Sequence, residues 1–282
     1  MTASPLGITG ATGRLGGRIA RRLAEAGVEQ RLLVRDASRA PVLAGAQVAE
    51  AGFGDRAAVT AALRGVRTVL MVSASESADR VAQHVAFIDA AAAAGVGQVV
   101  YISFYGAAPE CTFTLGRDHF ATEEHLRASG MAATILRDNL YADFLASMVG
   151  DDGVIRGPAA DGRVAVVTQD DIADAATAVL LEPDAHAGAT YSLTGPEALT
   201  MAEVADILTR ARGRTVTYHS ETVPEAYASR ASYGAPDWQV DAWVSTYTAI
   251  AAGELAGVTS DVERLSGHPA TSFAELLART AS

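Results

Sequence analysis

The stretch ITGATGRLGG at residues 8–17 decides the fold of this chain, because it sets glycines at three-residue spacing between an apolar run and a helical pattern. Gly10 stands at the predicted turn, Gly13 at a point of close backbone approach, and Gly16 in the first helical turn against the strand. A dinucleotide pyrophosphate needs such a turn and the unpaired N–H groups of a helix N-terminus. The same spacing also occurs in tight turns without a ligand, but this strand–helix context predicts dinucleotide binding.

Short apolar runs alternate with helical patterns through the first half of the chain. The runs are continuously apolar, as expected for parallel strands covered by helices on both faces. We therefore predict an α/β fold: a Rossmann-type doubly wound parallel sheet with a smaller C-terminal α/β domain. Residues 1–149 are the predicted NAD(P)-binding Rossmann domain, to which residues 166–182 return, and residues 150–282 are the predicted substrate-binding domain.

The chain has 282 residues and a net charge of −11, which argues against nucleic acid as a partner because phosphate backbones attract basic surfaces. No apolar run approaches the roughly 18–20 residues of a membrane span, and the N-terminus lacks the pattern of a secretory signal. We expect a cytoplasmic protein, monomeric or homodimeric, with no membrane partner. One cysteine and six scattered histidines without ligand spacing predict no metal site.

The second predicted strand indicates which dinucleotide is bound. NAD-preferring folds place an acidic residue near the end of this strand, where it binds the ribose 2′-hydroxyl. Here the strand reads RLLVRD, and the guanidinium of Arg35 suits a 2′-phosphate. Arg14 inside the glycine loop adds a second positive charge, whereas Asp36 is an acid that a turn could also explain. We predict NADP, in its reduced form NADPH, over NAD.

The segments GATGRLG, VRD, VSASE and LRDNLY make this sequence resemble the NmrA-like family of atypical short-chain dehydrogenases. Within that family it most resembles the type-2 NAD(P)H:quinone oxidoreductases. The resemblance extends over nearly the whole chain and includes QHVAFIDAAAAAGV, HFATEEHLRASG and the SGHPATSFAELL tail. It implies a Rossmann domain and a smaller α/β domain that together bound a cleft.

The resemblance also implies cofactor contacts. By position, the phosphate contacts fall on Gly10, Thr12, Gly13, Arg14, Leu15 and Gly16, and the 2′-phosphate contact falls on Arg35. Ser73, Ala74 and Ser75 would line the cofactor after the fourth strand. The chain departs from the family after the third strand, where GFGD places Gly52 at a position that is acidic in many members. Phe53 would still lie along the adenine, but the contact of that acid is lost.

Ordinary short-chain dehydrogenases use Tyr-x-x-x-Lys, in which the lysine lowers the pKa of the tyrosine proton donor. This chain has no lysine, because all 22 of its basic residues are arginines. At the expected helix it has His119 and, one turn later, Glu123. His119 is our candidate proton donor, oriented by the Glu123 carboxylate, and the alternative is an ordinary solvated pair at i, i+4.

A quinone needs little acid catalysis, because hydride addition yields a stabilised phenolate that takes its proton from water. Such a reaction needs a positioned nicotinamide and an aromatic slot. The candidate slot residues are Phe104, Tyr105, Asn139 and Tyr141, with Trp238 and Trp243 as further candidates or simple core residues.

We predict an NADPH-dependent reductase of quinones or related aromatic carbonyl compounds, with polycyclic polyketide quinones among the candidate substrates. The second hypothesis is a non-catalytic NADP(H)-binding redox sensor of the NmrA type, which needs the glycine loop but no substrate pocket. A third is another reductive or isomerising step on an aromatic substrate, carried out with a partner enzyme.

Overall fold

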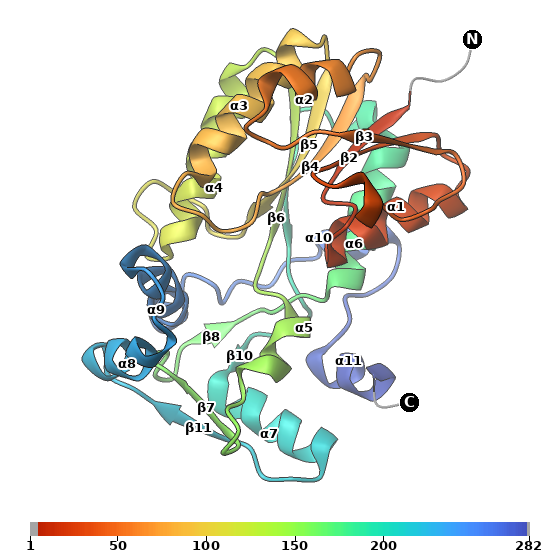
Figure 1. The fold of residues 1–282 in the computed structure, drawn as a ribbon. Coiled ribbons are helices and arrows are strands. Elements are labelled where there is room, and N and C mark those ends of the chain that lie inside the picture. The colour runs from red at the N-terminus through yellow and green to blue at the C-terminus, as the bar shows by residue number, and fades with distance from the viewer. Residues whose placement is uncertain (1–4, 281–282) are drawn as a thin grey trace. The chain divides into compact units, whose positions relative to one another are not determined.

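The computed structural model describes residues 5–280, and within them one sheet has the strand order β3-β2-β1-β4-β5-β6-β9 (Figure 1). Its strands are β1 (Leu6–Thr9), β2 (Gln30–Val34), β3 (Ala46–Glu50), β4 (Thr68–Val72), β5 (Gln98–Phe104), β6 (Ala132–Asp138) and β9 (Thr190–Leu193). The pairings from β3 through β5 are parallel. The amides of Ile135 and Asn139 bond to the carbonyls of Ala189 and Leu193, so β9 runs in the same direction. The doubly wound parallel sheet predicted from the sequence is confirmed.

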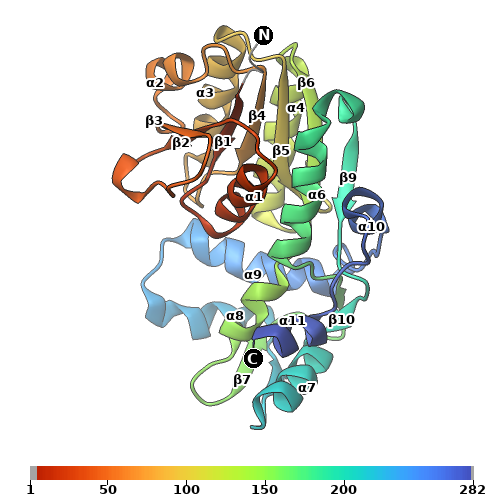
Figure 2. The same cartoon turned by 90° about the vertical axis from the view of Figure 1, so that its right-hand side faces the viewer.

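Helices cover both faces of this sheet (Figures 1 and 2). One face carries α2 (Arg56–Ala62), α3 (Arg80–Ala93) and α4 (Thr114–Ala128), and the other carries α1 (Arg14–Glu25) and α6 (Gln169–Leu181). An ion pair between Arg22 and Asp174, with 2.6 Å between nitrogen and oxygen, joins α1 to α6. Because both faces are covered, every residue of β5 is buried, as expected for a central strand of a parallel sheet.

The chain divides into two compact units whose segments interleave. The first comprises the residues up to Phe104, Asp118–Arg137 and Ile172–Tyr191, and the second comprises Tyr105–Arg117, Asp138–Asp171 and the chain from Ser192. The sequence predicted residues 1–149, with a return of residues 166–182, for the first domain; the first unit includes Ile172–Tyr191 but not Tyr105–Arg117 or Asp138–Asp171. The chain leaves the sheet after β5 and again after β6, and it returns through α6.

The second unit contains two small sheets. Its strands are β7 (Val154–Gly157), β8 (Arg163–Val164), β10 (Leu199–Thr200) and β11 (Thr217–Ser220), with β7 parallel to β11 and β8 antiparallel to β10. Its helices are α5 (Ala142–Leu145), α7 (Met201–Arg212), α8 (Val223–Arg230), α9 (Asp237–Ala251), α10 (Asp261–Ser266) and α11 (Phe273–Thr280). Thr200 and Glu203 form a reciprocal capping box at the start of α7.

Four 3₁₀ helices complete the elements of residues 5–280: η1 (Ala37–Arg39), η2 (Ala146–Met148), η3 (Pro183–His186) and η4 (Ala231–Tyr233). None of the helices within this range is both long enough and apolar enough to cross a membrane.

Candidate functional site

The glycine loop joins β1 to α1 at the carboxyl end of the sheet, where the strand order reverses between β1 and β4. Gly10 has a φ of +69°, in the left-handed region, and a Cβ there would lie 3.0 Å from Cβ of Val72. A Cβ on Gly16 would overlap the carbonyl oxygen of Gly10. The glycines therefore let the helix begin directly against the strand, which is the geometry of a phosphate-binding loop.

The N-terminus of α1 is open to an anion. Gly13 is the N-cap residue, no side chain caps the helix, and its first turn contains no acidic residue. Thr12, Gly13 and Arg14 are exposed, whereas Leu15 is buried in the core. Leu15 therefore anchors the helix through its side chain and can offer a ligand only its backbone N–H.

Arg35 follows β2, and its side chain is exposed. A Cβ on Gly52 would lie 4.0 Å from Cγ of Arg35, so the arginine stem passes over this glycine. Asp36 has a local role: its carboxylate accepts bonds of 2.6 Å and 2.9 Å from the hydroxyl and amide of Ser38. These two bonds hold the pKa of Asp36 below its ordinary value, and they fix the turn into η1. Asp36 is thus a turn residue, and the exposed guanidinium of Arg35 can bind a ligand.

Phe53 is half-buried at the edge of the core beside this strand end. Its ring stacks on that of Phe87, with 4.6 Å between centroids and 25° between planes. Its contact with an adenine stays a prediction.

The segment after β4, which the family resemblance assigned to the cofactor, is held by buried polar groups. Ser73 donates its hydroxyl to the carbonyl of Ile102 at 3.0 Å. The amide of Ala74 donates to Nε2 of His84 at 2.9 Å, and its carbonyl accepts from Nε of Arg80 at 3.1 Å. Ser75 is exposed. Side chains of α3 therefore fix both backbone groups of Ala74.

His84 is neutral in this arrangement. Because its Nε2 accepts from an amide, its proton lies on Nδ1, which donates to the hydroxyl of Thr122 at 2.9 Å. Burial, with a smaller contribution from the charge of Arg80, lowers the pKa of His84 from 6.5 to about 3. The loop after β4 therefore rests on an uncharged imidazole.

His119 does not have the environment that the sequence predicted. Nη2 of Arg80 lies 3.1 Å from its Nε2, and the phenol of Tyr101 lies 2.9 Å from its Nδ1. A guanidinium only donates, so Nε2 accepts and the single proton sits on Nδ1, pointing to Tyr101. Burial lowers the pKa of His119 well below its ordinary value. With both nitrogens engaged, His119 is better described as a positioning residue than as a proton donor.

The predicted pairing of His119 with Glu123 is wrong. Glu123 is fully buried and accepts from Ser103 at 2.6 Å, from Nη2 of Arg137 at 2.6 Å and from Nη2 of Arg127 at 2.9 Å. A buried carboxylate is most stable beside cations, and β6 supplies one in Arg137. The Glu123 carboxylate consequently binds Arg137 of the sheet, and the His119 imidazole contacts Arg80 instead.

The four predicted slot residues are in different environments. Phe104 is buried, with its ring centroid 6.1 Å from that of His119. The Tyr105 hydroxyl fills the space where a Cβ on Gly257 would stand.

Asn139 is fully buried: Nδ2 donates to the carbonyl of Leu255 and Oδ1 accepts from the amide of Leu140, so we assign it a structural role. Tyr141 is half-buried and donates to Asp138 at 3.0 Å.

The second unit contains a pocket of about 430 Å³ that the sequence did not reveal. It is lined by Ser147, Met148, Gly150, Val154, Arg156, Ser229, Arg230, Tyr233, Trp243 and Tyr247. Among the sequence candidates only Trp243 lines it, and Trp238 does not. One signal was available, since four large aromatic residues fall between positions 233 and 247 of a chain with 6% aromatic residues.

Comparison with known proteins gives the family. The model described as NmrA-like family matches residues 2–236, more than half of the sequence. The chain belongs to the NmrA-like family. Quinone oxidoreductase 2 of Escherichia coli is 36% identical over 277 residues, which cover 96% of each chain. An NAD(P)H azoreductase of Xenophilus azovorans is 34% identical over 273 residues, 95% of each. The crystal structure of the E. coli NADPH-dependent quinone oxidoreductase QOR2 complexed with NADPH has a TM-score of 0.90 at 33% identity, covering 98% of this chain and 100% of that one.

In this NmrA-like chain the fold brings most of the assigned cofactor residues to one edge of the sheet. The glycine loop, Arg35 and Ser73–Ser75 follow β1, β2 and β4, which are neighbours in the sheet. Parallel strands present their carboxyl ends at the same edge, so these residues converge. The residue that the sequence could not assign is Arg80, since a cation at the start of a helix resembles a solvated surface residue.

Proposed function

We propose that this chain is an NADPH-dependent oxidoreductase that transfers hydride to a quinone or a related aromatic carbonyl compound. The observation that carries the proposal is the uncapped N-terminus of α1, with exposed Arg14 within it and exposed Arg35 at the end of the next strand. Two cations beside an anion-binding loop suit the phosphates of NADPH better than those of NADH. The names of the related quinone oxidoreductase and azoreductase support a reductase of this kind.

The residues present fit such a dinucleotide. The amides at the start of α1 would hold the pyrophosphate, and the space that Gly16 leaves would let the helix stay close to the strand. Arg35 would hold the 2′-phosphate, and the segment Ser73–Ser75, fixed through Ala74, would support the nicotinamide end. NADPH supplies a hydride at its nicotinamide ring, and the protein supplies position.

The side chains around His119 favour an acceptor that needs no protein acid. The imidazole proton is committed to Tyr101, and the sequence has no lysine. A quinone that receives hydride gains two electrons and one hydrogen nucleus and becomes a phenolate, which takes one proton from water. Arg80, 6% exposed, holds a positive charge beside this segment that favours such an anion.

The test is consumption of NADPH by the purified protein with a panel of quinones that includes polycyclic polyketide quinones, followed by loss of dihydronicotinamide absorbance and by detection of the hydroquinone. We expect turnover with at least one quinone and a lower KM for NADPH than for NADH. Binding of NADPH without turnover of any quinone or azo compound would overturn the proposal in favour of a redox sensor.

A further inference from the structure

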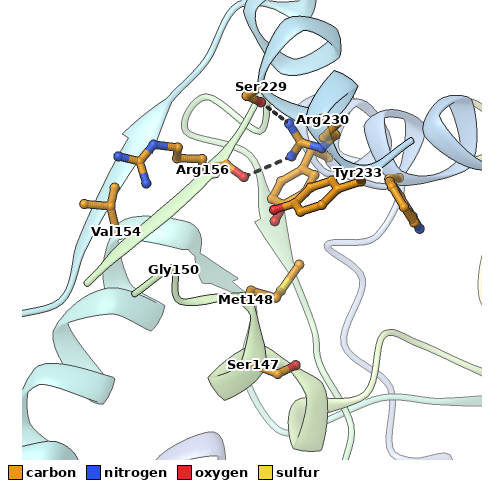
Figure 3. Close-up of a pocket in the computed structure, with 10 residues that line it drawn as sticks. Ser147, Met148, Gly150, Val154, Arg156, Ser229, Arg230 and Tyr233 are labelled. Atoms are coloured by element: carbon orange, nitrogen blue, oxygen red, sulfur yellow. Dashed lines mark hydrogen bonds between the residues drawn. The ribbon is translucent and has the colours of Figure 1, made fainter. Parts of the chain in front are cut away.

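The pocket of the second unit has walls that suit a flat ring system. The rings of Tyr233 and Trp243 meet edge to face, at 5.9 Å between centroids and 89° between planes. Tyr233 is 71% exposed despite its size, and Ser147 and Met148 lie across the pocket from it (Figure 3). Ligand pockets commonly have volumes of about 300–1,000 Å³, so this one has room for a small aromatic ligand.

Tyr247 is the fixed element of this pocket. It is only 6% exposed, and its ring occupies the space where a Cβ on Gly157 would stand. The guanidinium carbon of Arg230 lies 5.4 Å from the ring centroid. Arg230 is itself held at 2.8 Å by Glu221. It also donates to the carbonyl of Arg156 at 3.1 Å (Figure 3). The contacts with Gly157 and Arg230 hold the Tyr247 ring in place.

Tyr247 lines the pocket, and a tyrosine hydroxyl can donate a hydrogen bond to a ligand there. The guanidinium of Arg230 lies against the Tyr247 ring, and it donates its hydrogen bonds to Glu221, Ser229 and the carbonyls of Ala226 and Arg156. Burial raises the pKa of Tyr247 to about 12, so the proton stays in place at neutral pH.

The charged groups at the pocket are paired within the unit. Arg230 pairs with the nearly buried Glu221, and Arg156 makes bonds of 2.6 Å and 3.1 Å to the two oxygens of Asp152. In Figure 3 the Arg156 side chain points away from Tyr233. A guanidinium already held by a carboxylate attracts a further anion weakly, so these arginines favour a neutral ligand.

We propose that this pocket binds a neutral, planar aromatic carbonyl compound against Tyr233 and Trp243, with its carbonyl oxygen accepting a hydrogen bond from Tyr247. The aromatic rings supply the apolar contact, and the tyrosine hydroxyl distinguishes a carbonyl compound from a hydrocarbon. The assignment of this ligand as the hydride acceptor rests on the proposed function.

Binding is measured without NADPH, so that it does not depend on turnover. In a Trp238→Phe background Trp243 is the remaining tryptophan of the sequence, and 1,4-naphthoquinone should quench its fluorescence saturably. The Tyr247→Phe variant keeps the ring and removes the hydroxyl, and it should weaken binding about 5–10-fold. The matched control is Tyr227→Phe, which removes a hydroxyl bonded to Asp241 on a residue that does not line the pocket, and it should bind as before.

Two further probes test the ligand class. Naphthalene should bind more weakly than 1,4-naphthoquinone to the parent protein and should be insensitive to Tyr247→Phe, because it has no oxygen to accept the bond. The anionic 1,4-naphthoquinone-2-sulfonate should bind no more tightly than the neutral quinone. Equal loss of naphthalene and naphthoquinone binding in Tyr247→Phe, or tighter binding of the sulfonate, would overturn the proposal.

Turnover separates this proposal from the proposed function. Tyr247→Phe should raise the KM for 1,4-naphthoquinone by the same factor as its Kd, and leave the KM for NADPH unchanged. If the quinone binds as expected but is never reduced, the pocket assignment stands and the reductase proposal fails. If reduction proceeds with a KM that Tyr247→Phe does not change, the quinone bound in this pocket is not the hydride acceptor, and the reductase proposal stands.

Discussion

Nη2 of Arg80 lies 3.1 Å from Nε2 of His119, and this contact fixes the protonation of the histidine. The side chain of Arg80 also donates from Nε to the carbonyl of Ala74 at 3.1 Å, and its charge acts on the carboxylate of Asp118. Arg80 is only 6% exposed, so these contacts hold a buried positive charge beside the segment that follows β4.

Replacing His119 by alanine should leave the pH dependence of kcat unchanged in shape. The histidine proton is held by Tyr101 and cannot be the one delivered. We expect a loss of about 1–3 kcal/mol in unfolding free energy, because Arg80 and Tyr101 each lose a partner, together with a higher KM for NADPH. The measurement is a pH series of kcat for both proteins. Disappearance of an ionisation near neutral pH in the variant would identify His119 as an acid catalyst after all.

Stability should fall on acidification because of the buried histidines. The folded-state pKa of His84 is about 3 against 6.5 for an ordinary histidine, so below pH 6.5 the unfolded chain binds a proton that the folded chain does not. The stabilisation is fully present above pH 6.5 and is lost toward pH 3, at about 1.4 kcal/mol per pH unit. Urea unfolding at several pH values measures this slope. His84→Gln should reduce it, and His219→Gln, at an exposed site, should not.

Replacing Arg35 by glutamine should weaken NADPH binding about 10–100-fold, as expected for loss of a charge-assisted hydrogen bond. NADH, which lacks the 2′-phosphate, should bind nearly as before. Arg39→Gln is the matched control, since Arg39 is also exposed but lies one turn further along, in η1. The dissociation constants of NADPH and NADH, measured by titration of each variant, test whether Arg35 binds the 2′-phosphate. Equal losses for the two would place the 2′-phosphate elsewhere.

The lack of a side chain at Gly52 should favour NADPH over NADH, because it leaves the neighbouring Arg35 without a competing carboxylate. A Cβ there would make ordinary contact with the Arg35 stem, so Gly52→Asp should fold, and its carboxylate would compete with a 2′-phosphate for the guanidinium. We expect NADPH affinity to fall about tenfold with NADH affinity retained. Gly54→Asp is the control, because a Cβ at Gly54 would meet nothing within 4 Å. A loss shared by both variants would point to net charge rather than to the contact with Arg35.

Much of the secondary structure could be predicted from local sequence. The spacing of Gly10, Gly13 and Gly16 and the continuously apolar strands depend on near neighbours and on a simple periodicity. The capping box of Thr200 and Glu203 depends on four consecutive residues. Such features survive into the fold because distant contacts do not displace them: Arg163 bonds to Glu203 in addition to the capping box.

The partners of His119 and Glu123 could not be predicted in this way. One helical turn of separation suggested that they pair, but Arg80 from α3 and Arg137 from β6 compete for them. The same holds for Asn139, whose polar side chain suggested a ligand contact before its bond to Leu255 was known.

The sequence by itself determined the sheet, the glycine loop and the lack of any lysine, because each follows from residue type and spacing. Only the tertiary structure decided which nitrogen of His119 carries the proton, where the two units divide, and that Tyr233, Trp243 and Tyr247 line one pocket with Ser147 and Met148. The physical reason is that hydrogen-bond partners and pocket walls come from segments far apart in the chain, whose meeting no local pattern records.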